Sequence, residues 1–180
     1  DEVKKFFTLP NDIKLKYRQP EVNNQRGFVQ FGTEHAKGSS VMDLKEFWQV
    51  GQTNIPQAAD MSYYPANGSV DEAPEFAQCS DDLYKALESV GSTVLEALAM
   101  HLGLATDYFT GYIDGGNSIL RAIHYPPISG EPDSSVRAAE HEDINLITLL
   151  VGASASGLEV MGTDGQWNKV TANSEHLVMN

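Results

Sequence analysis

The sequence predicts an α+β fold in which helices come first and short antiparallel strands follow. A long amphipathic pattern, with apolar residues at steps of three or four, ends near residue 102. After residue 118 the apolar residues occur in short runs that Gly, Pro and Asn residues separate, as in strands joined by turns. Helices followed by short strands are typical of an α+β domain with an antiparallel sheet or one half of a jelly roll.

The N-terminal part of the chain alternates short elements with loops. Residues 1–18 carry helical spacing in two short pieces. Residues 25–32 are bounded by glycines and predict an extended segment, whereas residues 43–51 fit either a helical turn or a strand. Residues 52–76 are rich in Pro, Gly and Asn and predict a long surface loop. A further short helix is expected at residues 107–112.

The clearest helix is predicted from about Ser80 to Leu102. Ser80 is a suitable N-cap, and Gly103 can end the helix. The apolar stripe that defines it consists of Leu83, Leu87, Val90, Val94 and Leu98. We expect this stripe to pack against the sheet, with Leu87, Val90 and Val94 buried, so that truncation of Leu87 costs about 2–5 kcal/mol of stability.

The second part of the chain carries the predicted strands. They lie at residues 118–125, 136–151, 157–161, 167–170 and 175–179, with a turn at residues 163–165. The organisation therefore changes near residue 118, and we expect a helical and loop region at 1–117 and a sheet core at 118–180, in one domain. The chain starts without Met and stops inside an apolar pattern, so we expect it to be a fragment of a longer protein.

Composition and charge exclude several classes of partner. The 180 residues are 41% apolar and 21% charged, which is ordinary for a globular domain, and the net charge is −13. This charge argues against nucleic acid or an anionic membrane surface as the main partner. The single cysteine, Cys79, allows no internal disulfide and fits a reducing compartment, so we expect a cytoplasmic protein. No apolar run approaches the length of a membrane span.

A candidate metal half-site precedes the apolar run at 144–151. His141 and Asp143 are two residues apart, so in an extended chain their side chains point to the same face and Glu142 points to the other. One imidazole and one carboxylate on a common face can hold one side of a divalent metal, and a 2-His-1-carboxylate triad needs a second histidine from elsewhere. A His-x-Asp pair alone often arises by chance, and its position at a predicted buried strand strengthens the case because unmatched charges are costly there.

Several segments, taken together, resemble a known family. They are Ser118-Ile119-Leu120-Arg121 with His124-Tyr125-Pro126-Pro127, then Arg137 with His141-Glu142-Asp143 and Leu146-Ile147-Thr148-Leu149-Leu150, and finally Gly157-Leu158-Glu159-Val160 with Gly165-Gln166-Trp167. Their order and spacing are similar to those of the isopenicillin N synthase-like iron(II)/2-oxoglutarate-dependent oxygenases. Arg26-Gly27-Phe28 and Asp43-Leu44-Lys45-Glu46-Phe47-Trp48 resemble the bacterial branch of that family.

The resemblance implies a double-stranded β-helix, or jelly roll, with the N-terminal helices packed on it and its C-terminal part missing, so that residues 118–180 form the first half of the core. It implies that His141 and Asp143 bind iron(II) and that Tyr125 hydrogen-bonds 2-oxoglutarate. Arg121 lies four residues before Tyr125, hence on the same strand face, and could add positive charge near this anion. A structural pairing of Arg121 with a carboxylate is the alternative.

The other histidines do not complete the triad. In the family the second histidine ligand and an Arg-x-Ser that anchors 2-oxoglutarate lie farther along the chain than residue 180. His176 is too close to the motif, and His124 alternates with Tyr125 and should face away from the site. We expect His101 to be structural or at the surface, and His35 to lie in a loop that could border a substrate pocket.

The residues leave three functions open. The first is an oxygenase that uses iron(II), 2-oxoglutarate and O2 to hydroxylate or oxidatively cyclise a small molecule, with no catalytic residues beyond the metal ligands. The second is a non-catalytic jelly-roll binding module or pseudoenzyme, and the third is a zinc hydrolase, which also uses His and carboxylate ligands. Because only two ligands are present, we expect the 180-residue chain on its own to be inactive.

Overall fold

The computed structural model of the protein describes residues 1–34, 43–55, 63–127, 137–151, 156–171, 173 and 175–180. It contains helices and small antiparallel sheets, as the α+β prediction requires. The chain forms two compact units, residues 1–141 and residues 142–180, which are described separately. The boundary expected near residue 118 stays a prediction.

Two short helices open the first unit, as predicted for residues 1–18. Helix α1 spans Glu2–Thr8 and helix α2 spans Asn11–Lys14, and two 3-10 turns, η1 (Leu15–Tyr17) and η2 (Pro20–Val22), follow. Pro10 separates α1 from α2 because it favours the start of a helix over its interior. Phe6 and Phe7 of α1 are buried.

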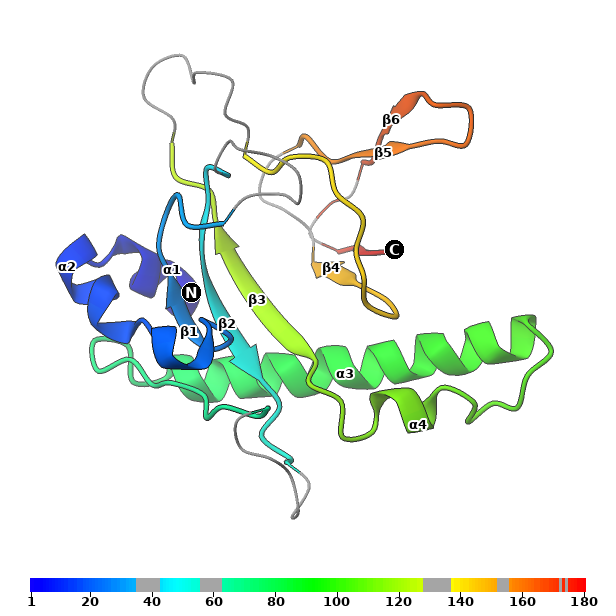
Figure 1. Ribbon diagram of the computed structural model, residues 1–180, viewed down its shortest axis with the longest axis horizontal. Helices are drawn as coiled ribbons and strands as arrows, with labels where there is room; N and C mark the ends of the chain where they lie inside the picture. Colours follow the sequence, from blue (N-terminus) through cyan, green and yellow to red (C-terminus); the bar gives the residue numbers. More distant parts are fainter. Residues whose placement is uncertain (35–42, 56–62, 128–136, 152–155, 172, 174) are drawn as a thin grey trace. The chain divides into compact units, whose positions relative to one another are not determined.

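A three-stranded antiparallel sheet forms the centre of the first unit. Strand β2 (Glu46–Gly51) lies between β1 (Gly27–Val29) and β3 (Ile119–His124), which Figure 1 shows side by side. The structure thus resolves residues 43–51, which fitted a helical turn or a strand, as a strand over its last six residues. All six residues of β2 are buried, because β2 is paired on both edges and covered on both faces.

The hydrophobic core lies on the face of this sheet that carries Phe28, Trp48 and Ala122, which are cross-strand partners. The buried core comprises Phe6, Phe7, Phe28, Trp48, Val50, Val70, Ala73 and Phe76. Aromatic rings meet edge to face, as in Phe6–Trp48 with centroids 4.9 Å apart, an arrangement that the ring quadrupoles favour. Val70 and Ala73 belong to the segment predicted as a surface loop, so this part of the prediction was wrong: residues 63–75, which the structure describes, contain no helix or strand but contribute to the core.

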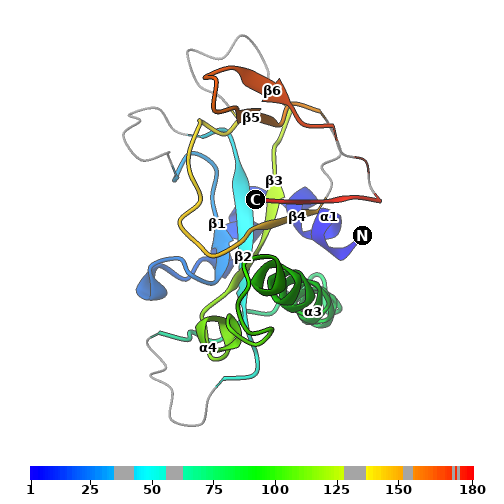
Figure 2. The ribbon, with the colours of Figure 1, turned by 90° about the vertical axis from the view of Figure 1, so that its right-hand side faces the viewer.

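Helix α3 (Phe76–His101) begins four residues earlier than predicted, so Ser80 lies inside it and is not its N-cap. Figure 2 shows α1 and α3 on the same side of the sheet. The C-terminus follows the prediction: Gly103 has φ +71°, its N–H donates to the Met100 carbonyl, and the Leu104 N–H donates to the Ala99 carbonyl, which together form a Schellman motif. Helix α4 (Thr110–Ile113) is shorter than the helix expected at 107–112.

The prediction that Leu87, Val90 and Val94 form the buried stripe of α3 was wrong. Leu83 and Val90 are 43% and 40% exposed, and Leu87 and Val94 are half-buried. The buried residues of α3 are Phe76, Ser80, Tyr84, Gly91, Leu95 and Ala99. This face combines aromatic residues with small ones, which allow close approach, and Tyr84 Oη donates to the Ser118 carbonyl at 3.2 Å. The helix is therefore rotated from the orientation that its Leu and Val residues alone suggest.

The second unit consists of two antiparallel strand pairs. Strand β4 (Leu149–Val151) pairs with β7 (Leu177–Met179), and β5 (Glu159–Met161) pairs with β6 (Trp167–Lys169). The predicted turn at 163–165 joins β5 to β6, with Gly165 at φ +75°. Of the strand predicted at 136–151, the structure describes residues 137–151, and these are regular only at 149–151, so that His141 and Asp143 lie in the irregular segment before β4.

Candidate metal and cosubstrate site

Arg121 lies on β3, on the sheet face opposite the hydrophobic core. Its guanidinium stacks over the Phe47 ring at 4.2 Å and helps to bury it. The guanidinium also donates to both carboxylate oxygens of Glu34, at 3.1 and 3.3 Å, and to Gln49 Oε1 at 3.2 Å. In the first unit Arg121 is therefore paired with a carboxylate, which is the structural role that the sequence left open; its contact with 2-oxoglutarate stays a prediction.

His124 points to the other face, as its alternation with Arg121 and Tyr125 predicted. Its Nδ1 lies 2.8 Å from Glu46 Oε1, and its ring packs against that of Phe7 at 5.1 Å. Glu46 also accepts from Lys14 Nζ with both carboxylate oxygens at 2.8 Å. This arrangement excludes His124 from the face that carries Arg121 and confirms the prediction.

Tyr125 directly follows β3 and contacts Arg137. The Arg137 guanidinium lies 5.9 Å from the centroid of the Tyr125 ring, and its Nη1 donates to the Tyr125 carbonyl at 3.3 Å. Arg137 thus places a positive charge beside a half-buried tyrosine at the end of β3. Sequence reasoning assigned no role to this contact.

The His141 imidazole is oriented by the backbone of its own segment. Nδ1 lies 2.8 Å from the Ala139 carbonyl oxygen. A carbonyl oxygen can only accept, so Nδ1 carries a hydrogen, and in the neutral imidazole Nε2 then carries the ring lone pair. A metal-binding histidine is usually held in this way, with one ring nitrogen donating to a carbonyl or carboxylate.

Asp143 belongs to the second unit and is held at the end of the β4–β7 pair. Its Oδ2 accepts from Thr148 Oγ1 at 2.5 Å and from Asn180 Nδ2 at 3.1 Å. Thr148 and Asn180 precede β4 and follow β7, and exchange backbone hydrogen bonds at 2.8 and 3.2 Å. The carboxylate is therefore oriented by residues that the strand pairing brings together.

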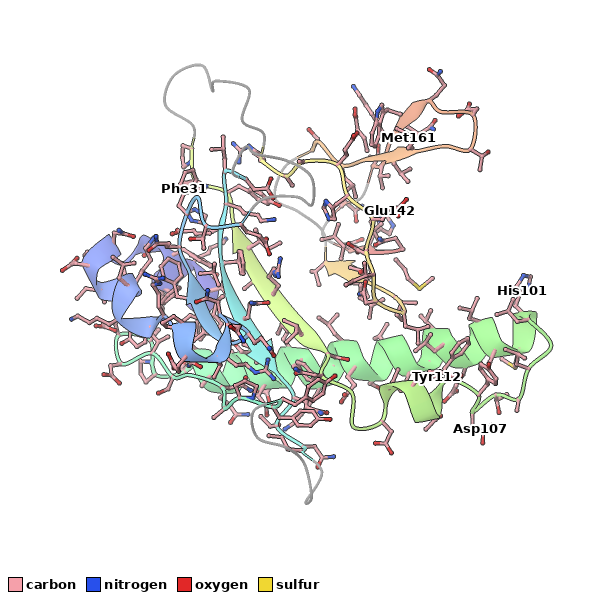
Figure 3. The ribbon with its side chains drawn as sticks, viewed as in Figure 1. Phe31, His101, Asp107, Tyr112, Glu142 and Met161 are labelled. Carbon is pink, nitrogen blue, oxygen red and sulfur yellow. The ribbon has the colours of Figure 1, made fainter. Side chains whose placement is uncertain are left out.

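The remaining candidate histidines are accounted for separately. His101 is exposed at the end of α3 (Figure 3). His176 lies in the turn before β7, where its Nδ1 accepts from the Asn173 N–H at 3.5 Å. His35 lies outside the described residues. Within the ranges that the structure describes, no three His, Cys, Asp or Glu side chains are grouped closely enough to hold a metal ion.

Sequence reasoning missed a cluster of charges that adjoins Arg121. Lys45 Nζ lies 2.8 Å from Glu34 Oε2 and 2.9 Å from Asp43 Oδ2, and the Lys45 side chain is only 9% exposed. Asp43 Oδ1 in turn accepts from the Ala139 N–H at 3.2 Å. A usable signal was the spacing of Asp43 and Lys45, which are two residues apart and so share a face in extended chain.

Comparisons with known protein families cover both parts of the chain. Residues 1–69 match the model described as the N-terminal region of non-haem dioxygenases in morphine synthesis, and residues 116–180 match the 2OG-Fe(II) oxygenase superfamily model. Proline hydroxylase buaE of Petromyces alliaceus is 35% identical over 166 residues, which are 87% of this chain and 50% of that protein. The chain thus spans about half the length of curated relatives such as this one.

Solved structures are similar over almost the whole chain. A Caulobacter crescentus protein assigned to the 2OG-Fe(II) oxygenase family superposes with a TM-score of 0.86 and 41% identity, over 100% of this chain and 58% of that one. A full-length Neurospora crassa protein, solved in complex with alpha-KG, superposes with a TM-score of 0.79 and 29% identity, over 99% and 56% of the two chains. In the part of the chain that the structure describes, no helix is long and apolar enough to cross a membrane.

Proposed function

This chain belongs to the iron(II)/2-oxoglutarate-dependent oxygenase family, and we propose on that basis that the protein oxidises a small-molecule substrate with O2 and 2-oxoglutarate. The observation that carries the proposal is the orientation of His141, whose Nδ1–H donates to the Ala139 carbonyl, so that a metal would bind through Nε2. The single cysteine, Cys79, fits a reducing compartment, and we place the protein in the cytoplasm.

We propose that the strands after residue 118 are part of a double-stranded β-helix. Support comes from the antiparallel pairing of β2 with β3, of β4 with β7 and of β5 with β6, and from the match of residues 116–180 to the superfamily model. In such a fold the metal would be held where strand ends and the connecting segments meet.

His141 and Asp143 fit an iron(II) ion as two members of a 2-His-1-carboxylate triad. An imidazole nitrogen and a carboxylate oxygen are the donors that this triad requires. Both side chains are held by hydrogen bonds: His141 Nδ1 donates to the Ala139 carbonyl, and Asp143 Oδ2 accepts from Thr148 and Asn180. Such contacts orient metal ligands. We expect the second histidine from outside residues 1–180.

Tyr125 and Arg121 are the proposed contacts for 2-oxoglutarate. The Tyr125 hydroxyl would donate to a carboxylate of this dianion, and the neighbouring Arg137 adds positive charge. Arg121 is bound to Glu34, so its contribution would be a longer-range one. Iron with 2-oxoglutarate supplies O2 activation and attack on a C–H bond, while the protein supplies ligands, orientation and a site that excludes water.

The proposal is tested by anaerobic iron(II) titration and by succinate formation from 2-oxoglutarate, with the full-length protein. His141→Ala and Asp143→Ala should each weaken iron binding and reduce succinate formation to background. His101→Ala is the matched control, because this histidine is exposed at the end of α3, and it should leave both readouts unchanged. Iron binding that persists in His141→Ala would contradict the metal assignment, and iron binding without succinate formation would favour a non-catalytic module.

A further inference from the structure

We propose that Asp43 is a positioning residue for the metal ligand His141, acting through the backbone of Ala139, and that Lys45 fixes Asp43 in place. The inference rests on the proposed function only in that it takes His141 as a ligand. It concerns two residues of the N-terminal part that neither the His-x-Asp motif nor the match to the superfamily model at residues 116–180 includes.

Two consecutive hydrogen bonds link Asp43 to the His141 ring. Asp43 Oδ1 accepts from the Ala139 N–H at 3.2 Å, and the Ala139 carbonyl accepts from His141 Nδ1 at 2.8 Å. Ala139 therefore lies between the carboxylate and the imidazole, with its donor used on one side and its acceptor on the other. Rotation of the Ala139 backbone would change the direction of the carbonyl and hence the orientation of the imidazole.

Asp43 is suited to hold this backbone because its own position is fixed. It is 4% exposed, its second carboxylate oxygen lies 2.9 Å from Lys45 Nζ, and its N–H donates to the Glu34 carbonyl at 3.0 Å. Burial alone would lower the pKa of Lys45, but the hydrogen bonds with Glu34 and Asp43 outweigh it and raise that pKa. Lys45 is therefore a cation that holds both carboxylates at neutral pH.

The segment that carries His141 depends on such contacts. Residues 137–141 lie outside the strands that the structure describes, so no strand ladder holds them. Two of its hydrogen bonds reach the preceding part of the first unit: Arg137 donates to the Tyr125 carbonyl, and Ala139 donates to Asp43. Only the second is adjacent to the Ala139 carbonyl that orients the ring. Loss of the Asp43 acceptor should therefore release His141 more than it disturbs the sheet.

The test measures Co(II) affinity and the Co(II) visible spectrum of the full-length protein, without turnover. Asp43→Ala should weaken Co(II) binding by roughly 10–100-fold, the usual effect of removing a contact that orients a ligand, and should alter the visible bands. Asp43→Asn keeps an oxygen acceptor for Ala139 but turns its amide nitrogen toward Lys45 Nζ, so its affinity for Co(II) should lie between those of the wild type and Asp43→Ala. Glu46→Ala is the matched control: Glu46 is also 4% exposed and paired with a buried lysine, but its partners are Lys14 and His124. It should lose stability and keep the wild-type spectrum.

The outcomes separate this inference from the proposed function. If the wild-type protein binds Co(II) no better than His141→Ala does, the metal assignment fails and the inference falls with it. If His141→Ala loses binding but Asp43→Ala binds as the wild type does, only the role of Asp43 is overturned.

Two measurements on the wild-type metal-free protein keep the test decisive if Asp43→Ala does not fold. The Ala139 amide should exchange with solvent more slowly than an unprotected peptide, and nitrogen-15 NMR should find His141 as the Nδ1–H tautomer. Fast exchange at Ala139, or the Nε2–H tautomer at His141, would overturn the proposal.

Discussion

The buried ion pair between Lys14 and Glu46 should make Glu46→Gln one of the most destabilising single substitutions in the first unit. The side chains are 9% and 5% exposed, and both carboxylate oxygens lie 2.8 Å from Lys14 Nζ. At that distance, with an effective dielectric constant of about 20, the attraction between the two charges is about 6 kcal/mol. The desolvation of two buried ions offsets most of this attraction, so the intact pair contributes little net stability.

Removal of one partner lowers the free energy of unfolding by more than the intact pair contributes to it. In Glu46→Gln the Lys14 ammonium stays buried without its counter-ion, and such changes cost about 3–5 kcal/mol. The neighbouring His124 loses the same carboxylate. At about 2–4 °C per kcal/mol for a domain of this size, the melting temperature should fall by roughly 6–20 °C.

A double-mutant cycle with urea unfolding measures this effect in the full-length protein. Lys14→Met together with Glu46→Gln removes both charges and should recover a large part of the loss, with a coupling energy of about 1–3 kcal/mol. The exposed pair of Asp81 and Lys85 is the control, and Asp81→Asn should shift the melting temperature far less. If the free energy of unfolding of Glu46→Gln lies within about 0.5 kcal/mol of the wild-type value, the carboxylate is not needed to neutralise Lys14 and the reasoning is refuted.

Three further predictions address packing and pH. Leu95→Ala should lower the free energy of unfolding by about 2–5 kcal/mol, because Leu95 is 3% exposed. Leu83 is 43% exposed, so Leu83→Ala should lower it clearly less, and equal losses in the two variants would contradict the assigned face of α3. Because the pKa of Lys45 is raised, its stabilising effect is complete below the unfolded-state pKa of about 10.4 and is lost as the pH rises through the folded-state value. The urea concentration at the unfolding midpoint should therefore fall as the pH rises above about 10, and it should fall less steeply with pH in Lys45→Met. Identical pH profiles for the wild type and Lys45→Met would argue against this role of Lys45. Gly51→Ala would place a Cβ 1.8 Å from Nη2 of the fully buried Arg26 and should lower the free energy of unfolding by about 1–3 kcal/mol. An unchanged melting temperature would show that the Arg26 side chain can move away.

Features that depend on a few neighbouring residues followed from the sequence alone. The two N-terminal helices separate at Pro10, α3 ends in a Schellman motif at Gly103, and the β5–β6 turn contains Gly165. Alternation along β3 correctly assigned His124 to the face opposite Arg121. These features are local: each is set by backbone dihedral preferences or by the period of an element.

The candidate site was only partly accessible to sequence reasoning. His141 and Asp143 were predicted as metal ligands from their spacing, Tyr125 as a cosubstrate contact from the resemblance to a family, and Arg121 from its even spacing to Tyr125; all four roles stay predictions. The contact between Asp43 and Ala139 joins residues 96 positions apart, and no pattern in either segment indicates it.

The buried face of α3 and the formation of a buried strand at residues 46–51 were likewise decided by tertiary structure. Leu and Val residues define one stripe on α3, but the helix buries the stripe of Tyr84, Leu95 and Ala99, because the surface that it must cover, not its own composition, selects the face. Residues 43–51 fitted a helical turn as well as a strand until β1 and β3 provided hydrogen-bond partners on both edges. Hydrogen bonds and close packing between segments far apart in sequence depend on the folded arrangement of the whole unit, and local propensity contains no information about it.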